Sequence, residues 1–262
     1  MTSPYASVLL AGVDLVRPDL PGVQDVVVHG IEGWHTTPDS RADDSSLVAD
    51  DGEVASDRLY GARVLAINGT VVCESPEALH GFRDVLAGLV RSPSRLEVVG
   101  YGVTQWVNVV RTGGLAGWDR LSRYAARWQL QLKAPDPRKY GITRRFPETG
   151  ATPVRTATDV YHEGNYPAAP RITVTGYMPQ GFTAFGTGSD RFRVTEGVNT
   201  GETLVADFKT GHVYLDGVRV PAAGGYRSLA RIDPYITRAT NVIPATGAGT
   251  GQYFVEVTDT WI

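Results

Sequence analysis

The alternation of apolar and polar positions predicts mostly short β-strands. Residues 128–134, "WQLQLKA", place a tryptophan, two leucines and an alanine on one face and polar side chains on the other. This two-residue period is typical of a half-buried strand. Pro135 and Pro137 follow directly. Because proline lacks the ladder N–H and restricts the residue before it, the strand should end at Ala134.

Residues 62–72, "ARVLAINGTVV", predict a β-hairpin. Asn68 and Gly69 tolerate positive φ, as the two central residues of a type I′ turn require. The expected hairpin therefore pairs the residues before Asn68 with those after Gly69.

Residues 75–90, "SPEALHGFRDVLAGLV", predict the one α-helix of the chain. Ser75 is a suitable N-cap, Pro76 suits the first helical position, and Glu77 lies near the positive end of the helix dipole. Apolar residues recur at helical spacing on a single face, which should pack on a sheet. They are Leu79, Phe82, Leu86, Leu89 and Val90.

The second half of the chain predicts another set of strands. From Ile142 the sequence is polar and rich in turn residues, and strands are expected only from about Arg171. Residues 202–220 predict a three-stranded meander with turns at Thr210-Gly211 and Asp216-Gly217. Alternation over residues 252–262 predicts a final strand. Short strands at this spacing are typical of a β-sandwich.

Composition agrees with a mainly β protein. The chain has 262 residues, 42% of them hydrophobic and 20% charged, with a net charge of −3, 30 glycines and 16 prolines. This length suits two domains, expected at residues 1–140 and 141–262. We expect no signal peptide and no membrane insertion, because the apolar stretch near the N-terminus is short and interrupted by Asp14.

Residues 39–57 form an acidic segment that contains few large apolar side chains. Its composition predicts a long, solvated loop or arm. Its seven acidic residues are Asp39, Asp43, Asp44, Asp50, Asp51, Glu53 and Asp57.

No catalytic, cofactor or metal signature is present in the sequence. It contains no G-x-S-x-G, H-E-x-x-H or phosphate-loop motif. Cys73 is the only cysteine, which excludes intrachain disulfides and multi-cysteine metal sites. The five histidines are scattered, and the acidic pairs fit a solvated charge run better than calcium or glycosidase chemistry. We therefore expect a non-enzymatic protein without a cofactor or metal.

The order of these motifs resembles a known family. "GARVLAINGTVV", one helix, a strand pair and "WQLQLKAPDPRKYG" resemble the N-terminal domain of distal tail proteins of long, non-contractile-tailed bacteriophages. "EGNYPAAPRITVTG", "TGETLVADFKTGHVYLDG" and "VEVTDTWI" are similar to their galectin-like C-terminal domain. The resemblance implies an N-terminal β-sandwich or split barrel with one helix and a hairpin, followed by a galectin-like β-sandwich.

The resemblance also implies a structural role in the virion. Such proteins form a hexameric ring at the distal end of the tail. The implied partners are other copies of the chain, the tail tube protein, the tape-measure protein and a hub or fibre protein. A ring needs interacting surface on both flanks of each subunit.

A short basic cluster, Arg138, Lys139, Arg144 and Arg145, suggests two roles. Nucleic-acid binding is disfavoured, because the chain is net acidic and has no wide basic surface. We expect instead an electrostatic contact between subunits, in which the acidic segment of one copy meets this cluster in its neighbour. Its acidic side would include Asp43, Asp44, Asp50 and Asp51.

Carbohydrate binding is the alternative function. Exposed aromatic rings stack on sugars, so a sandwich of this kind can recognise a host cell-wall glycan. Burial in a sandwich core is the more common role of such residues. The aromatic residues concerned are Tyr161, Tyr166, Tyr177, Phe182, Phe185, Tyr214 and Tyr226.

Overall fold

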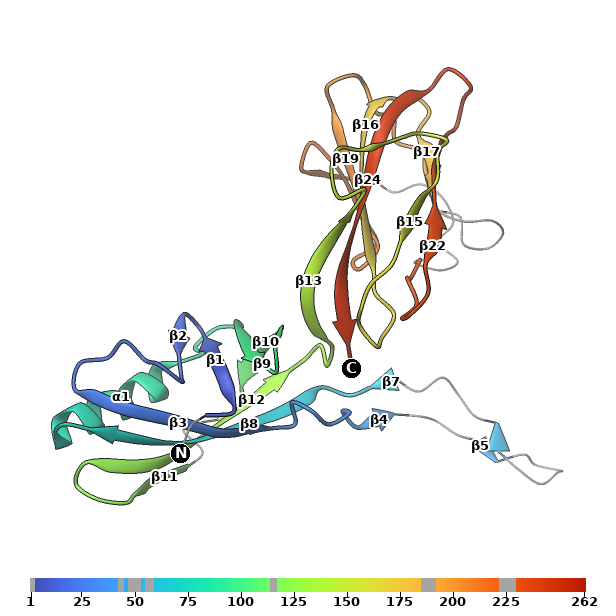
Figure 1. Cartoon of the computed structure of the whole chain (residues 1–262). Coiled ribbons are helices and arrows are strands. Elements are labelled where there is room, and N and C mark those ends of the chain that lie inside the picture. The colour runs from blue at the N-terminus through green and yellow to red at the C-terminus, as the bar shows by residue number, and fades with distance from the viewer. Residues whose placement is uncertain are drawn as a thin grey trace. The chain divides into compact units, whose positions relative to one another are not determined.

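The chain divides into two compact units. The computed structural model describes residues 3–41, 45–46, 53–54, 59–113, 117–184, 192–221 and 230–262. One unit comprises Met1–Lys139 with Ile262, and the other comprises Tyr140–Trp261. Within the described residues the chain forms strands and a single α-helix (Figure 1), which confirms the prediction of a mainly β protein.

Two antiparallel sheets enclose the core of the first unit. One sheet has the order β2 (Val13–Asp14), β1 (Tyr5–Leu10), β9 (Ser94–Gly100) and β10 (Val103–Arg111). The other has the order β3 (Val23–Glu32), β8 (Arg63–Cys73), β12 (Ala125–Ala134) and β11 (Gly117–Arg120). The end of β10 also pairs with β12, so the two sheets are hydrogen-bonded at one corner.

The predicted hairpin at Asn68-Gly69 is wrong. β8 runs through both residues as one eleven-residue strand, paired with β3 on one side and β12 on the other. Gly69 serves close packing rather than a turn, since an added Cβ would lie 2.4 Å from the Trp128 ring. Leu65, Ile67 and Val71 share the buried face, and this alternation passes through the Asn-Gly pair unbroken.

The predicted strand end and helix are confirmed. β12 ends at Ala134, and its apolar face, from Trp128 to Ala134, is buried. α1 spans Pro76–Gly88, and the Ser75 hydroxyl accepts a hydrogen bond from the Ala78 N–H at 3.1 Å. Phe82 meets the Trp128 ring edge-on at a centroid distance of 6.2 Å, so the helix packs on the sheet that contains β8 and β12.

The described parts of the acidic segment are extended. β4 (Ser40–Arg41) pairs with β7 (Leu59–Tyr60), and β5 (Ser45–Ser46) pairs with β6 (Glu53–Val54), both antiparallel. The sequence predicted a long, solvated loop or arm and gave no indication of these strands. Backbone pairing forms these ladders even though the segment lacks an apolar alternation.

The described part of the second unit contains one larger sheet and two smaller ones. The larger sheet has the order β13 (Lys139–Phe146), β24 (Thr250–Trp261), β16 (Pro170–Tyr177), β19 (Thr203–Asp207), β20 (His212–Leu215) and β21 (Val218–Val220). β14 (Thr152–Pro153) pairs with β24. The smaller sheets are β15 (Thr158–Val160) with β22 (Arg238–Thr240), and β18 (Phe192–Val194), β17 (Phe182–Ala184) and β23 (Val242–Pro244).

Several predictions for this unit are confirmed and one is wrong. The meander β19–β20–β21 has its second turn at Asp216 and Gly217, both with positive φ, and β24 is the expected final strand. Strands β13, β14 and β15, however, precede Arg171. Only the first two residues of β13 and Phe146 at its end are buried, so this strand carries no apolar alternation that the sequence could reveal.

Candidate functional site

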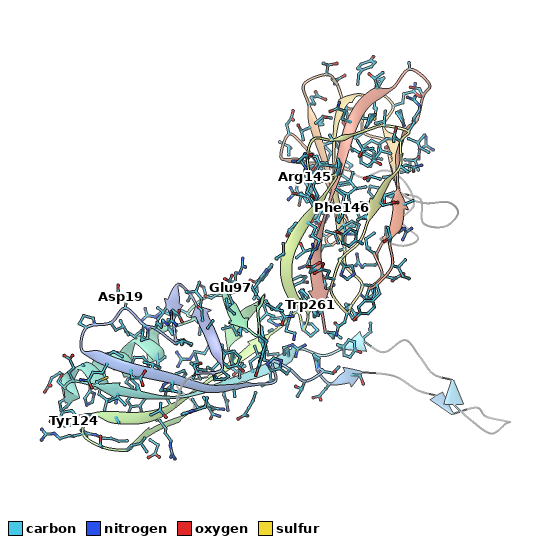
Figure 2. All side chains as sticks on the ribbon, in the orientation of Figure 1. Asp19, Glu97, Tyr124, Arg145, Phe146 and Trp261 are labelled. Atoms are coloured by element: carbon cyan, nitrogen blue, oxygen red, sulfur yellow. The ribbon has the colours of Figure 1, made fainter. Side chains whose placement is uncertain are left out.

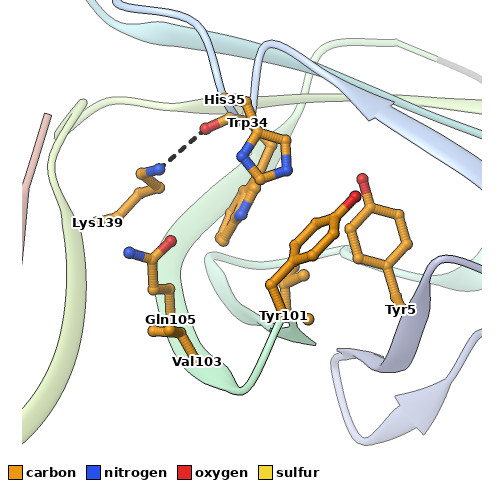
Figure 3. A pocket seen from close by; sticks show the side chains of 9 residues that line it. Tyr5, Trp34, His35, Tyr101, Val103, Gln105 and Lys139 are labelled. Carbon is orange, nitrogen blue, oxygen red and sulfur yellow. Dashed lines mark hydrogen bonds between the residues drawn. The ribbon is translucent and has the colours of Figure 1, made fainter.

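A cavity of about 220 Å³ lies in the first unit, where β1, β9 and β10 meet the turn after β3 and the chain segment after β12 (Figure 3). Its walls combine aromatic rings with one lysine and one amide. They are formed by Tyr5, Trp34, His35, Val98, Gly100, Tyr101, Val103, Gln105 and Lys139.

The β9–β10 hairpin shapes one wall of the cavity. Val103 and Gln105 point to the same side because successive residues of a strand alternate. Across the ladder they pair with Gly100 and Val98. Gly100 lets the Tyr5 ring approach closely, since an added Cβ would lie 3.1 Å from that ring. The cavity therefore depends on the register of this hairpin.

The turn after β3 supplies the opposite wall. Gly33 has φ +80°, and a Cβ there would lie 2.0 Å from the Val64 carbonyl oxygen, so only glycine fits. The turn places buried Trp34 against the cavity. The His35 ring meets the Tyr101 ring edge-on, with 6.1 Å between centroids.

Lys139 is the buried cation of the cavity. Only 7% of its surface is exposed. Its Nζ donates a hydrogen bond to the Trp34 carbonyl at 3.0 Å and lies 5.4 Å from the centroid of the Trp34 ring. Burial, and secondly the charge of Arg63, lower the pKa of Lys139 to about 8. The ammonium is thus held by a carbonyl and an aromatic face.

Arg63 is a second buried cation in this region, with 2% of its surface exposed. Its Nη1 donates to the carbonyl oxygens of Gly33 and Thr36, both at 2.6 Å, and its Nε donates to that of Pro137 at 2.9 Å. Its Nη2 is buried without a hydrogen-bond partner. Across the described residues, neither Arg63 nor Lys139 forms an ion pair with a carboxylate.

The structure places the four residues of the predicted basic cluster in different environments. Arg138 forms an ion pair with Asp136 at 2.7 Å. Lys139 is buried in the cavity, whereas Arg144 pairs with Glu163 at 2.6 Å and with buried Asp259 at 3.4 Å. Arg145, next to Phe146 on β13 (Figure 2), is exposed and lies 3.8 Å from the centroid of the Phe254 ring. The acidic residues Asp43, Asp44, Asp50 and Asp51 lie outside the described residues.

A hollow of about 250 Å³ in the second unit is lined by Arg144, Arg145, Phe146, Glu148 and Tyr161. Of the aromatic residues proposed for sugar binding, Tyr161 and Tyr177 are exposed. Phe182 is fully buried, and Tyr166 and Tyr214 are half-buried. Phe185 and Tyr226 lie outside the described residues. The fold thus brings one of the proposed aromatics, Tyr161, to the wall of a hollow.

His162 is buried in the second unit. Its Nε2 lies 3.1 Å from the Ile232 carbonyl, and its Nδ1 accepts a hydrogen bond from the Gly164 N–H at 3.0 Å. The ring is therefore neutral with its proton on Nε2, and burial lowers the pKa of His162. In the described part of the chain, no three His, Cys, Asp or Glu side chains converge as metal ligands would.

Sequence reasoning missed Arg63 and Trp34. A signal for Arg63 was present, because it lies in phase with Leu65 and Ile67 on the buried face of β8. A cation in phase with an apolar face indicates a buried, hydrogen-bonded group. The role of Trp34 carried no such signal, since it depends on the backbone of the turn at Gly33.

The fold matches a solved structure along the whole chain. It is similar to the Dit protein (gp 19.1) of phage SPP1, described as a paradigm of the hub adsorption apparatus in phages that infect Gram-positive bacteria. The TM-score is 0.73 at 14% identity, covering 98% of this chain and 99% of that one. The activated, calcium-containing baseplate of phage P2 matches with a TM-score of 0.46 and 7% identity, covering 89% and 90%.

Sequence comparison adds no relative: neither the family models nor the curated proteins contain a match. The predicted resemblance to distal tail proteins is confirmed at the level of the fold by the similarity to the SPP1 Dit structure.

Within the described residues, no helix is long and apolar enough to span a bilayer.

Proposed function

We propose that this chain is a structural protein of a bacteriophage virion, located at the distal end of the tail. It forms a hexameric ring that joins the tail tube to the hub or fibre proteins and surrounds the tape-measure protein. The observation that carries the proposal is the whole-chain match to the SPP1 Dit fold, which includes both units. The proposal assigns no catalytic activity to the chain.

Exposed apolar side chains on the first unit support a role in assembly. Leu59, Val64, Tyr101 and Leu121 are all exposed. A ring needs contact surface on two different flanks of each subunit, and large exposed apolar side chains are common in such contacts.

The test measures mass and shape together. Light scattering of the 28.2 kDa chain, alone and with the tail tube and hub proteins of its virion, should give six copies per particle. Negative-stain images should show a ring. Val64→Glu should weaken assembly, whereas Glu32→Gln at another exposed site should not. A monomer under all these conditions would contradict the ring.

We also propose that the acidic segment of one copy contacts basic side chains of its neighbour. Arg145 is the best probe, because it is exposed, whereas Lys139 is buried and Arg138 and Arg144 form ion pairs within their own units. Arg145→Glu should make assembly weaker and less sensitive to salt, since surface pairs are screened. Arg171→Glu, an exposed arginine on β16, is the control. Equal assembly of both variants would exclude Arg145 from the contact.

Carbohydrate binding is the second candidate. The hollow beside Tyr161 favours it, because an exposed ring flanked by arginines and Glu148 offers stacking and hydrogen bonds to a sugar. Titration with host cell-wall polysaccharide should show saturable binding that Tyr161→Ala abolishes and Tyr177→Ala leaves intact. Absence of saturable binding, or equal loss in both variants, would exclude this hollow.

A further inference from the structure

Within the described residues, the cation in the cavity of the first unit has no carboxylate partner. Lys139 and Arg63 are both more than nine-tenths buried, and within the described residues their hydrogen-bond acceptors are backbone carbonyls. Buried charges in proteins are normally paired or bound to a ligand of opposite sign. The region therefore has an unmatched positive charge.

The Lys139 ammonium has donors to spare. An ammonium carries three N–H donors. One of them binds the Trp34 carbonyl, and no other hydrogen bond of Nζ is made within the described residues. The Gln105 amide lies beside Lys139 and adds further donors (Figure 3), and the rings of Tyr5 and Tyr101 line the same cavity. These groups suit an acceptor with two oxygen atoms.

We propose that this cavity binds a carboxylate group, with Lys139 Nζ as its ion-pair partner and the aromatic side chains of Tyr5, Trp34 and Tyr101 around its aliphatic stem. The carboxylate comes from an acidic side chain of another polypeptide or from a small organic acid. The proposal does not depend on ring formation or on the tail role.

Size and access agree with a ligand of this kind. The cavity of about 220 Å³ is smaller than the roughly 300–1,000 Å³ of most drug-sized ligand sites. It fits a glutamate-sized group rather than a nucleotide. Tyr101, 81% exposed, and exposed His35 stand at its rim, so a group on another molecule can enter.

Protonation should control the binding. Lys139 has a pKa of about 8, so the ammonium form dominates at pH 6.5 and is largely lost at pH 9.5. The other titratable groups that face it are His35, Tyr5, Tyr101 and Arg63. Burial, and secondly Lys139, lower the pKa of His35, so this ring is mostly neutral at pH 6.5 and above. Affinity for a carboxylate should therefore fall as pH rises past 8.

The experiment compares two isosteric probes on the full chain. N-acetylglutamate and its neutral amide, N-acetylglutamine, are titrated at pH 6.5 while NMR shifts of the Trp34 indole and the Lys139 side chain are followed. We expect N-acetylglutamate to bind at least tenfold more tightly than the amide. Its affinity should fall at least fivefold at pH 9.5.

Variants assign the effect to the cavity. Lys139→Met should weaken N-acetylglutamate binding at least tenfold, and Lys133→Met, an exposed lysine on β12, should not change it. Gln105→Glu retains the lysine and adds a carboxylate within the cavity, so it should also block binding. Equal affinity for both probes, no binding, or unchanged affinity in Lys139→Met would overturn the proposal.

A further arm identifies the source of the carboxylate. A synthetic peptide of residues 39–57 is titrated in the same way. Shifts at Trp34 and Lys139, lost in Lys139→Met, would assign the carboxylate to a second copy of this chain. Binding of N-acetylglutamate without binding of the peptide would assign it to another protein or to a small acid.

Discussion

The two units stabilise their cations in opposite ways: those of the first unit are buried, whereas the Arg144 side chain of the second is 27% exposed. In the first unit, Arg63 and Lys139 donate to backbone carbonyls, and no described carboxylate pairs with them. In the second unit, Arg144 pairs with Asp259, which is 3% exposed and also accepts a hydrogen bond from the Glu163 N–H at 2.9 Å. Among the described residues, the two cations of the first unit have no carboxylate partner, whereas Arg144 in the second unit has two.

The difference distinguishes a structural ion pair from a site that can bind a ligand. Carbonyl dipoles satisfy the geometry of a guanidinium or ammonium but leave its net charge in place. Burial, and secondly the charge of Arg63, lower the pKa of Lys139 to about 8. In the second unit, burial works to lower the pKa of Arg144, but Asp259 and Glu163 raise it overall. Arg144 therefore has carboxylate partners for its charge, whereas Lys139 has none among the described residues.

The largest loss of stability is expected when the Arg144–Asp259 ion pair is broken. Asp259→Ala removes the buried carboxylate that pairs with Arg144 and accepts a hydrogen bond from the Glu163 N–H. We expect about 3 kcal/mol lower free energy of unfolding, near the low end for breaking buried pairs because Arg144 is partly exposed. Urea denaturation measures the loss, and hydrogen exchange should locate it in β24 and residues 159–166.

Glu163→Gln is the matched control for Asp259→Ala. It removes the other carboxylate that pairs with Arg144, one whose side chain is 64% exposed. Exposed pairs contribute about 0–1 kcal/mol. A loss as large as that of Asp259→Ala would show that burial does not distinguish the two carboxylates.

Arg63→Met should have the next largest effect, in the first unit. The carbonyls of Gly33, Thr36 and Pro137 lose their charged donor, which we expect to cost about 2 kcal/mol. At the same time the pKa of Lys139 should rise, because one of the two causes that lower it is the charge of Arg63. NMR titration of the Lys139 side chain measures this. An unchanged pKa would contradict the coupling of the two cations.

The pH dependence of stability is a further test of the unmatched charge. The pKa of Lys139 is lower in the folded state, about 8, than its ordinary 10.5, so the unfolded chain binds more protons between these values. Stability should therefore rise by about 2 kcal/mol from pH 8 to pH 10. Subtracting the profile of Lys139→Met isolates this lysine from other groups. A flat difference would show that Lys139 titrates normally.

The smallest effect is expected from shortening the acidic segment. Replacing residues 42–58 by a two-residue Asn-Gly turn should change stability by less than about 0.5 kcal/mol, since shorter loops cost little closure entropy. The pKa of Lys139 should stay near 8. A fall in stability together with a fall in that pKa would show that carboxylates of this segment partly balance the two cations, and the first unit would then resemble the second.

Periodicity predicted the elements whose side chains alternate with burial. The apolar face of β12, the helix with its Ser75 cap and the turn at Asp216-Gly217 all follow from local rules. The turn at Asn68-Gly69 did not form, because β3 and β12 pair with β8 on both sides and Trp128 needs the space beside Gly69. Tertiary packing overrode a local turn signal.

The cavity depends on contacts that no local pattern contains. Lys139 was recognised as part of a basic cluster, but its burial depends on Trp34, more than one hundred positions earlier in the sequence. The prolines after Ala134 predicted the end of β12 but not what holds the chain beyond it. In the structure the Pro137 carbonyl accepts a hydrogen bond from Arg63. Such long-range polar contacts are set by topology.

One guanidinium holds the two ends of the acidic segment together. Arg63 follows the acidic segment in the chain, and its hydrogen bonds reach Gly33 and Thr36, which precede that segment. The Gly61 N–H also donates to the Asp39 carbonyl at 2.8 Å. The residues before and after the acidic segment are thereby held at a fixed spacing, whatever sequence lies between them. Changes in the length or charge of residues 40–60 should therefore leave the core and the cavity of the first unit intact.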